Sequence, residues 1–297
     1  MKILSIGEFM VEMKNTSPNT YEKGYAGDTF NFAYYMRQLC PADWDIQYGT
    51  VLGNQAEDQN AINFIKSKNI GIDRIQSHPS KTIGLFLLSN TDDGEKQYGY
   101  WRSDSAARTF FNTVQSFDDF DMVYLSGITA AISNDKETLI TSIKNTYNSG
   151  VKIAYDLQHR RQLWSLTDGK EFFTQIIEFC NVVKISDEEW EWLYQNEKTI
   201  DQLSIQHPNI EIILTCGENP SQRWLNGECT DICPTKTVDK VIDSSAAGDS
   251  FIATYLTNTL LGKTPMTALE NASAVSSKVL QYKGSLIPES IIKKRKS

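Results

Sequence analysis

A regular alternation of apolar strands and amphipathic helices over residues 121–284 most restricts the fold that this chain can adopt. Short runs rich in Val, Ile and Leu, such as VKIAYDL and NVVKIS, alternate with helical patterns of about ten residues or more. Parallel strands need such a crossover between them, so the pattern indicates βαβ units. We therefore predict a three-layer α/β fold, with a mostly parallel central sheet and helices on both faces.

The first hundred residues depart from this alternation. Residues 2–13 are predicted to open with a buried strand that has Gly7 and Glu8 at its end, followed by a helix after Asp28 and a hairpin over 82–102 around an Asp-Asp-Gly turn. We expect residues of about 10–25 and 81–103 to form a small β lid, within one domain that spans residues 1–297. A lid of few strands is marginally stable alone, so we also expect its apolar face to pair with a second copy, giving a homodimer or higher homo-oligomer.

Composition excludes several classes of partner. The net charge of −8 leaves no basic surface for nucleic acid or an anionic membrane. Five scattered cysteines suit free thiols in a reducing cytoplasm. Cys229 and Cys233 could suggest a metal site, but no histidine lies near them and their segment predicts a hairpin through Asn226-Gly227. No signal-peptide pattern and no apolar run of about 18 residues is present, so we expect a cytoplasmic protein.

Polar residues recur where the predicted strands end. Glu8, Asp156 to Arg160, Ser186 to Glu189 and Gly217 each follow an apolar run, and Asp249 begins a helix. In open α/β sheets, ligands bind outside the carboxyl ends of the strands. We therefore expect these residues to converge on one binding site.

The segment SSAAGDS places small residues directly before an apolar helix. The first turn of a helix carries unpaired N–H groups and a partial positive charge, and small side chains let a phosphate approach them. Asp249 beside such a site would repel the ligand unless it takes a proton from a hydroxyl that attacks the phosphate. The alternative is that Asp249 only caps the helix.

These motifs resemble those of the ribokinase-like carbohydrate kinases, and the alanine-alanine form is typical of their 2-keto-3-deoxygluconate kinases. DSSAAGDSF is similar to the family signature Asp-Thr-Thr-Gly-Ala-Gly-Asp-Ser-Phe, and AGDTFN to Gly-Gly-Asp-Thr-x-Asn. YDLQHRRQLW is similar to Asp-x-Asn-x-Arg-x-x-Leu-Trp, and YGYWRSDSAA to a tyrosine–tryptophan–arginine segment. The resemblance covers nearly the whole chain.

The resemblance implies an ATP-dependent sugar kinase that requires Mg²⁺ and that could also bind a monovalent cation. Asp249 would be the general base, with an anion hole formed by Ala246, Ala247 and Gly248. The residues that would hold the sugar are Gly27, Asp28, Asn31, Phe86, Tyr100, Arg102 and Arg160, together with Asp249. Those on the nucleotide side would be Gln158, Arg160, Ser186, Thr215, Gly217, Asp243 and Gly248, with Glu189 bound to Mg²⁺ through water.

Several of these roles have alternatives. GDTFN could be only a capped helix start, and DEEWEW only an acidic first turn. Tyr100 and Arg102 would share one side of a strand, where Arg102 and Arg160 could bind the carboxylate of a sugar acid. Arg102 could instead pair with a nearby acid, and Arg160 could face the transferring phosphate.

Four positions depart from the family pattern, namely Ala26, Phe86, Gln158 and Pro220. Phe86 stands where a sugar-contacting tyrosine is common, so the substrate could differ. We predict phosphorylation of the terminal hydroxyl of 2-keto-3-deoxygluconate to its 6-phosphate. The alternatives are a fructokinase or another sugar kinase of this fold, and a catalytically silent sugar-binding protein. A dinucleotide-dependent oxidoreductase is disfavoured because the first strand ends without a Gly-x-Gly-x-x-Gly turn.

Overall fold

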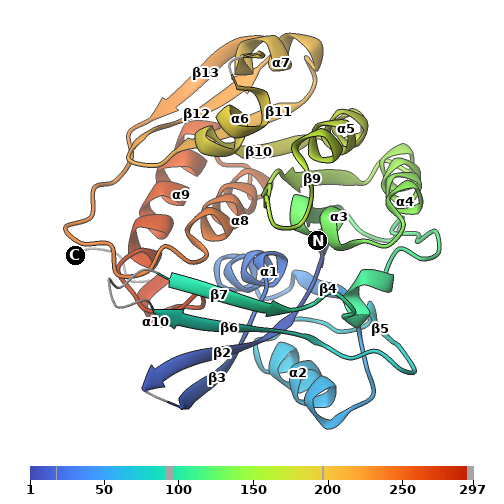
Figure 1. Cartoon of the computed structure of the whole chain (residues 1–297). Coiled ribbons are helices and arrows are strands. Elements are labelled where there is room, and N and C mark those ends of the chain that lie inside the picture. The colour runs from blue at the N-terminus through green and yellow to red at the C-terminus, as the bar shows by residue number, and fades with distance from the viewer. Residues whose placement is uncertain (18, 91–95, 196, 293–297) are drawn as a thin grey trace.

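A nine-stranded sheet forms the centre of the molecule (Figure 1). The computed structural model describes residues 1–17, 19–90, 96–195 and 197–292, and the predicted Asp-Asp-Gly turn at 92–94 lies outside them. The strand order is β13-β12-β11-β10-β9-β8-β1-β4-β5, and every pairing from β11 to β5 is parallel. The strands are β1 (Lys2–Ile6), β4 (Asp45–Leu52), β5 (Ile75–Ser77), β8 (Met122–Ser126), β9 (Lys152–Asp156), β10 (Val182–Ser186), β11 (Glu211–Cys216), β12 (Asn219–Leu225) and β13 (Glu228–Cys233).

Helices cover both faces of this sheet, which confirms the predicted three-layer α/β fold. Side chains of a strand alternate between faces, so Ile3 packs into one hydrophobic cluster and Leu4 into the other. The cluster around Ile3 includes α1 (Asp28–Leu39), α2 (Ala56–Ser67), α8 (Ala247–Leu260), α9 (Pro265–Val279) and α10 (Glu289–Ile292). The cluster around Leu4 includes α3 (Gly127–Ile132), α4 (Lys136–Asn148), α5 (Leu166–Ile176), α6 (Asp187–Tyr194) and α7 (Ile200–Gln206).

The short elements α3, α7 and α10 were not expected from the sequence, because each has too few residues to show a helical period. The predicted hairpin between β12 and β13 is confirmed. Asn226 and Gly227 both have positive φ, 52° and 79°, as a two-residue hairpin turn requires. None of the helices within the described ranges is long and apolar enough to cross a membrane.

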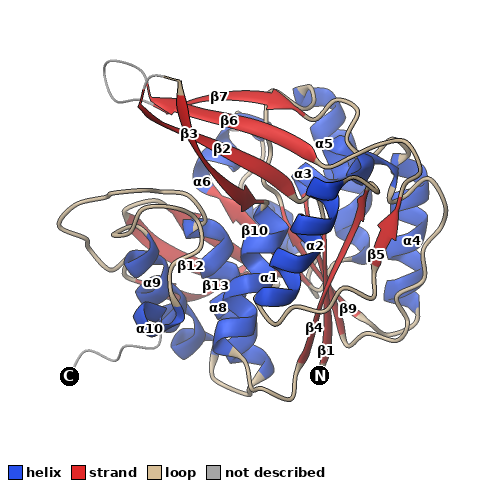
Figure 2. Cartoon of the chain, turned by 90° about the horizontal axis from the view of Figure 1, so that it is seen from below, coloured by secondary structure: helices blue, strands red, loops and turns tan. Residues whose placement is uncertain are grey.

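A second, four-stranded sheet stands apart from the central one and forms a separate layer in Figure 2. Its order is β3-β2-β6-β7; β2 and β6 are parallel, and the outer pairs are antiparallel. Its strands are β2 (Met10–Ser17), β3 (Thr20–Ala26), β6 (Gly84–Asn90) and β7 (Lys96–Trp101).

The chain passes from the central sheet to this second sheet at residues 7–9. β1 ends at Ile6, which agrees with the predicted strand end at Gly7 and Glu8, but β2, which begins at Met10 in the other sheet, was not predicted as a separate strand. The carboxylate of Glu8 is buried at this junction and accepts a hydrogen bond from Ser105. The apolar residues on the two sides of Gly7 and Glu8 are buried in different sheets, and an apolar pattern does not reveal such a change.

At Gly27 the chain leaves the second sheet and enters α1, which packs against the central sheet. This position tolerates no side chain. A Cβ built on Gly27 would lie 2.3 Å from the backbone oxygen of Glu8, so the two strand ends meet backbone to backbone. We expect Gly27→Ala to lower the free energy of unfolding by about 1–3 kcal/mol, as overpacking commonly does. Urea denaturation would measure the change.

Gly99→Ala is the matched control for this prediction. A Cβ at Gly99 would lie 3.4 Å from the Trp101 ring, an ordinary contact, and the free energy of unfolding should change by less than about 0.5 kcal/mol. Equal stability of the two variants would contradict the close approach at Gly27.

Candidate active site

A pocket of about 1070 Å³ lies between the second sheet and the carboxyl ends of the central strands. Every residue assigned above to the sugar, the nucleotide, the metal ion or the anion hole lines this one pocket. One end is bounded by the second sheet, including Phe86 and Tyr100, and the other end reaches residues 235–245 and α9. The structure thus brings together segments that are more than 200 residues apart in sequence.

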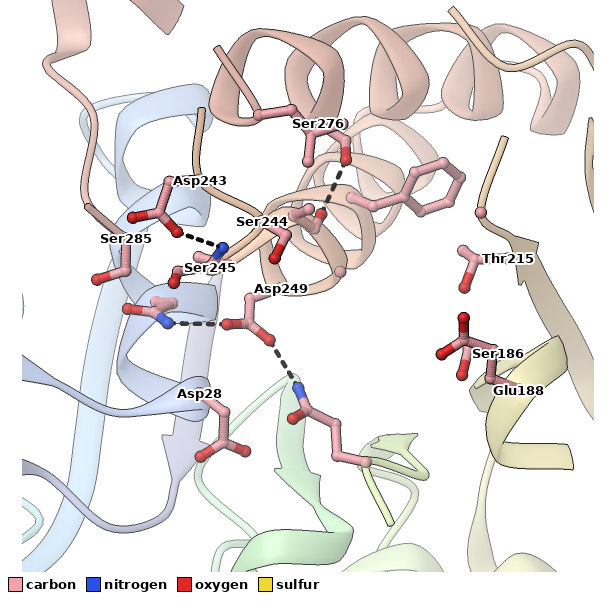
Figure 3. Close-up of a pocket in the computed structure, with 18 of the residues that line it drawn as sticks. Asp28, Ser186, Glu188, Thr215, Asp243, Ser244, Ser245, Asp249, Ser276 and Ser285 are labelled. Carbon is pink, nitrogen blue, oxygen red and sulfur yellow. Dashed lines mark hydrogen bonds between the residues drawn. The ribbon is translucent and has the colours of Figure 1, made fainter. Parts of the chain in front are cut away.

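Asp249 lies at the centre of the pocket, in the first turn of α8 (Figure 3). Its carboxylate is held by two side-chain amides. Asn31 Nδ2 donates to Oδ2 at 2.8 Å, and Gln158 Nε2 donates to Oδ1 at 2.6 Å. Asp249 is only 6% exposed, and this burial, together with the charge of Asp28, raises its pKa to about 7, although the Asn31 hydrogen bond opposes the shift. A carboxyl group with a pKa near 7 can both accept and release a proton at neutral pH.

The start of α8 presents bare backbone to the pocket. Ala246 is the N-cap residue, with a left-handed φ of 62°, and no side chain caps the helix. Within the described residues, the N–H groups of Gly248 and Asp249 make no hydrogen bond, whereas Ala247 N–H donates to the Ser244 oxygen at 3.3 Å. The alternative in which Asp249 caps the helix does not agree with this geometry, because its carboxylate contacts Asn31 and Gln158 instead. The arrangement is suited to bind an anion beside a base.

Asp28, the first residue of α1, lines the same pocket. The N-cap of α1 is Gly27, and the Asp28 carboxylate accepts a hydrogen bond from Ser126 Oγ at the end of β8. Burial raises the pKa of Asp28, while the charges of Arg160 and Arg102 oppose that shift. Two acidic groups, Asp28 and Asp249, therefore face one cavity.

Arg102 is paired with Glu8. β7 ends at Trp101, one residue before Arg102, but the Arg102 guanidinium lies 5.6 Å from the centre of the Tyr100 ring, so the two side chains are on one side as predicted. Glu8 is 1% exposed, so the acidic partner considered for Arg102 exists, but the pair is buried at the junction of the two sheets rather than at the surface. Arg102 still lines the pocket.

Arg160 is more open to solvent than Arg102. Its NH2 donates to Gln158 Oε1 at 3.1 Å, its NH1 lies 3.5 Å from Glu189 Oε1, and its side chain is 46% exposed. Gln158, which links Arg160 to Asp249, adopts a positive φ of 32° that turns it inward. Sequence reasoning placed Gln158 near the nucleotide and missed its contact with Asp249.

Ser186 and Glu189 form a capping box at the start of α6. The Ser186 hydroxyl accepts from Glu189 N–H, and Glu189 Oε2 accepts from Ser186 N–H at 3.1 Å. Both residues also line the pocket. On the opposite wall, Asp243 accepts a hydrogen bond from the N–H group of Ser245 (Figure 3). It also accepts one from the N–H group of Gly284 and so joins two loops.

Among the pocket residues that sequence reasoning missed, Tyr98 and Lys184 carry chemistry of interest. Tyr98 extends from β7 beside Tyr100, with their rings stacked at 6.1 Å. Lys184 is buried on β10 and forms an ion pair with Asp156 at 3.2 Å. A signal for Lys184 was present, since a lysine inside the apolar run NVVKIS must be paired when the strand is buried.

Comparison with known proteins identifies the family of this site. The model of the pfkB family carbohydrate kinases matches residues 1–292. The 2-dehydro-3-deoxygluconokinase of Dickeya dadantii is 30% identical over 303 residues, which cover 96% of each chain. The fold is similar to that of a fructokinase with bound ATP from Xylella fastidiosa (TM-score 0.82, 20% identity, 96% of this chain and 94% of that one). It is also similar to a 2-dehydro-3-deoxygluconokinase from Thermotoga maritima (TM-score 0.81, 19% identity, 99% and 97%). The chain belongs to the pfkB family of carbohydrate kinases.

Proposed function

We propose that this kinase transfers the γ-phosphoryl group of ATP to the terminal hydroxyl of 2-keto-3-deoxygluconate and forms the 6-phosphate. The observation that carries the proposal is the position of Asp249, a buried carboxylate with a raised pKa beside unbonded backbone amides. The relative from Dickeya dadantii, named for this substrate, supports the choice of sugar acid.

Asp249 would act as the general base. The terminal hydroxyl of the sugar attacks the γ-phosphorus, its proton passes to Asp249, and the bond to the β–γ bridging oxygen breaks as ADP leaves. Asn31 and Gln158 hold the carboxylate in one orientation through both of its oxygens. The N–H groups of Gly248 and Asp249 would stabilise charge on the transferring group, because they are already directed there before the reaction begins.

The nucleotide would extend from α8 toward Thr215, Gly217 and Asp243. Among the described residues, no group of three His, Cys, Asp or Glu side chains could hold a metal ion directly. This fits Mg²⁺, which keeps several waters and binds mainly to substrate phosphates, with Glu189 as a ligand through water. When bound, Mg²⁺ would neutralise phosphate charge.

Arg160 and Arg102 would bind the carboxylate of the sugar acid. A guanidinium matches a carboxylate with two parallel hydrogen bonds. Arg160 is exposed to the pocket. Arg102 would contact the substrate while it remains paired with Glu8. Both lie near Asp28, which would accept hydrogen bonds from the sugar hydroxyls.

A fructokinase activity is the second candidate. The observation that favours it is that Phe86 occupies the pocket wall where related kinases often have a sugar-contacting tyrosine. Phe86 is buried in the pocket wall and offers no hydroxyl to a sugar. Tyr98 and Tyr100, whose rings lie 6.2 and 5.9 Å from that of Phe86, could supply hydroxyls from β7. A panel of sugars and sugar acids with ATP would separate the two activities.

We expect Asp249→Asn to lower kcat by about 10²- to 10⁴-fold, the usual effect of removing a positioned base. A coupled assay of ADP release with 2-keto-3-deoxygluconate would measure it. Asp168→Asn, which changes an exposed aspartate in the first turn of α5, is the control and should keep wild-type activity. Retention of activity within about threefold in Asp249→Asn would argue against the base role, given this scale.

The pH profile provides an independent test. Because only the ionised carboxylate can accept a proton, kcat/KM should rise as the pH passes through about 7, the pKa of Asp249. Asp28→Asn removes a charge that raises this pKa, so the rise should move to lower pH. Asn31→Ala removes a hydrogen bond that lowers it, so the rise should move to higher pH. Identical profiles for both variants would exclude Asp249 as the titrating group.

The role of the arginines can be tested with a matched pair of substrates. 3-Deoxyfructose differs from 2-keto-3-deoxygluconate in having a hydroxymethyl group in place of the carboxylate. Arg160→Gln should lower kcat/KM for the acid by about 10- to 100-fold, the scale of a hydrogen bond to a charged group, with little change for 3-deoxyfructose.

Arg102 needs a paired variant, because its loss alone would leave Glu8 buried and uncompensated. The double variant Glu8→Gln/Arg102→Gln should show the same selective loss. An equal loss on both substrates would contradict carboxylate recognition by either arginine.

A further inference from the structure

A buried lysine lies beside the start of α8, and the mechanism above gives it no role. Lys184 is 5% exposed and lines the same pocket as Asp249. A Cβ built on Gly248 would lie 3.3 Å from Lys184 Nζ. The ammonium group is therefore next to the backbone whose amides we assign to the transferring phosphoryl group.

The charges around Lys184 favour its protonated form despite its burial. Burial alone would lower its pKa, but the charges of Asp156 and Glu189 outweigh that effect and raise the pKa above its usual value. Asp156 is fully buried, and its Oδ1 lies 3.2 Å from Lys184 Nζ. A lysine ammonium has three N–H donors, and Asp156 is its only ion-pair partner among the residues that the structure describes. Donors remain for a ligand.

The negative charges near the first turn of α8 mean that a bound phosphate would be stabilised by a cation there. Asp28 and Asp249 both line the pocket that an anionic phosphate would enter, and their carboxylates would repel it. Arg102 pairs with Glu8, Arg160 lies 3.5 Å from Glu189, and both arginines are assigned above to the carboxylate of the sugar acid. The ammonium group of Lys184, by contrast, lies beside Gly248 in the first turn of α8.

We propose that Lys184 is a catalytic residue, whose Nζ donates a hydrogen bond to a non-bridging oxygen of the transferring phosphoryl group, beside the amides of Gly248 and Asp249. This role rests on the proposed kinase reaction. Lys184 keeps its proton throughout, while the sugar oxygen–phosphorus bond forms, the bond to the bridging oxygen of ADP breaks, and the hydroxyl proton goes to Asp249. Asp156 holds the ammonium in place.

The competing explanation is that Lys184 only neutralises Asp156. A single Lys184→Met variant cannot separate the two, because it would leave Asp156 buried without its partner and could prevent folding. The double variant Asp156→Asn/Lys184→Met removes both charges and keeps the approximate volume. If neutralisation were the only role, this variant would regain the kcat of Asp156→Asn alone.

The expected results are a kcat of Lys184→Met and of the double variant lower by about 10²- to 10³-fold, as for the loss of one preorganised donor, with KM for the sugar nearly unchanged. Lys184→Arg should retain part of the activity because it keeps a cationic donor. Lys170→Met, which breaks an ion pair with Glu197 away from the pocket, is the control for loss of one positive charge. A double variant as active as Asp156→Asn would overturn the proposal.

A binding measurement separates failure of this inference from failure of the proposed function. Calorimetry with Mg²⁺-ATP and Mg²⁺-ADP needs no sugar, so it applies even if the wild-type protein phosphorylates none of those tested. The preference for ATP over ADP should fall about tenfold or more in the double variant, since a charge-assisted hydrogen bond to the γ-phosphate is lost. An unchanged preference would overturn the role of Lys184, whatever the substrate proves to be.

Discussion

The hydrogen-bonded carboxylate of Asp249 is the contact on which the site depends. It joins three segments that are distant in sequence, because Asn31 comes from α1, Gln158 from the loop after β9 and Asp249 from α8. The two amides orient the carboxylate but do not neutralise it, so its buried charge stays costly and its pKa rises to about 7. The same contact thus holds the elements together and keeps the carboxylate reactive.

Charge in the pocket is balanced by pairs. Glu8 pairs with Arg102 where the two sheets join, Glu189 lies beside Arg160, and Asp156 pairs with Lys184. Asp28 and Asp249 have no such cation within ion-pair distance among the described residues, and burial raises the pKa of both. The unpaired acids are therefore the ones that face the proposed sugar, whereas the paired groups form the walls around them.

The junction between the two sheets also matters for function. The strands of the second sheet leave and rejoin the body at residues 7–9, at Gly27 and just after Trp101. The Glu8–Arg102 pair and the backbone contact at Gly27 lie at these positions. The second sheet, which carries Phe86, Tyr98 and Tyr100, is therefore attached to the central sheet and its helices next to Asp28. The aromatic wall of the pocket and Asp28 are thus held together by the same junction.

The sequence alone determined the α/β architecture and the hairpin at Asn226-Gly227, because strand and helix periods and small-residue turns are local properties. The resemblance to the carbohydrate kinases supplied the site residues, which all line the pocket, but it did not supply Tyr98 or Lys184. The sequence also indicated Asp249 as a base, since a carboxylate beside small residues at a helix start has few other uses. Only the tertiary structure showed that β2 leaves the central sheet after β1 and that Arg102 pairs with Glu8. It also showed that Gln158 contacts Asp249 and that Lys184 lies beside Gly248. Those contacts join residues far apart in the chain, and their energies come from burial and charge pairing, which no local pattern records.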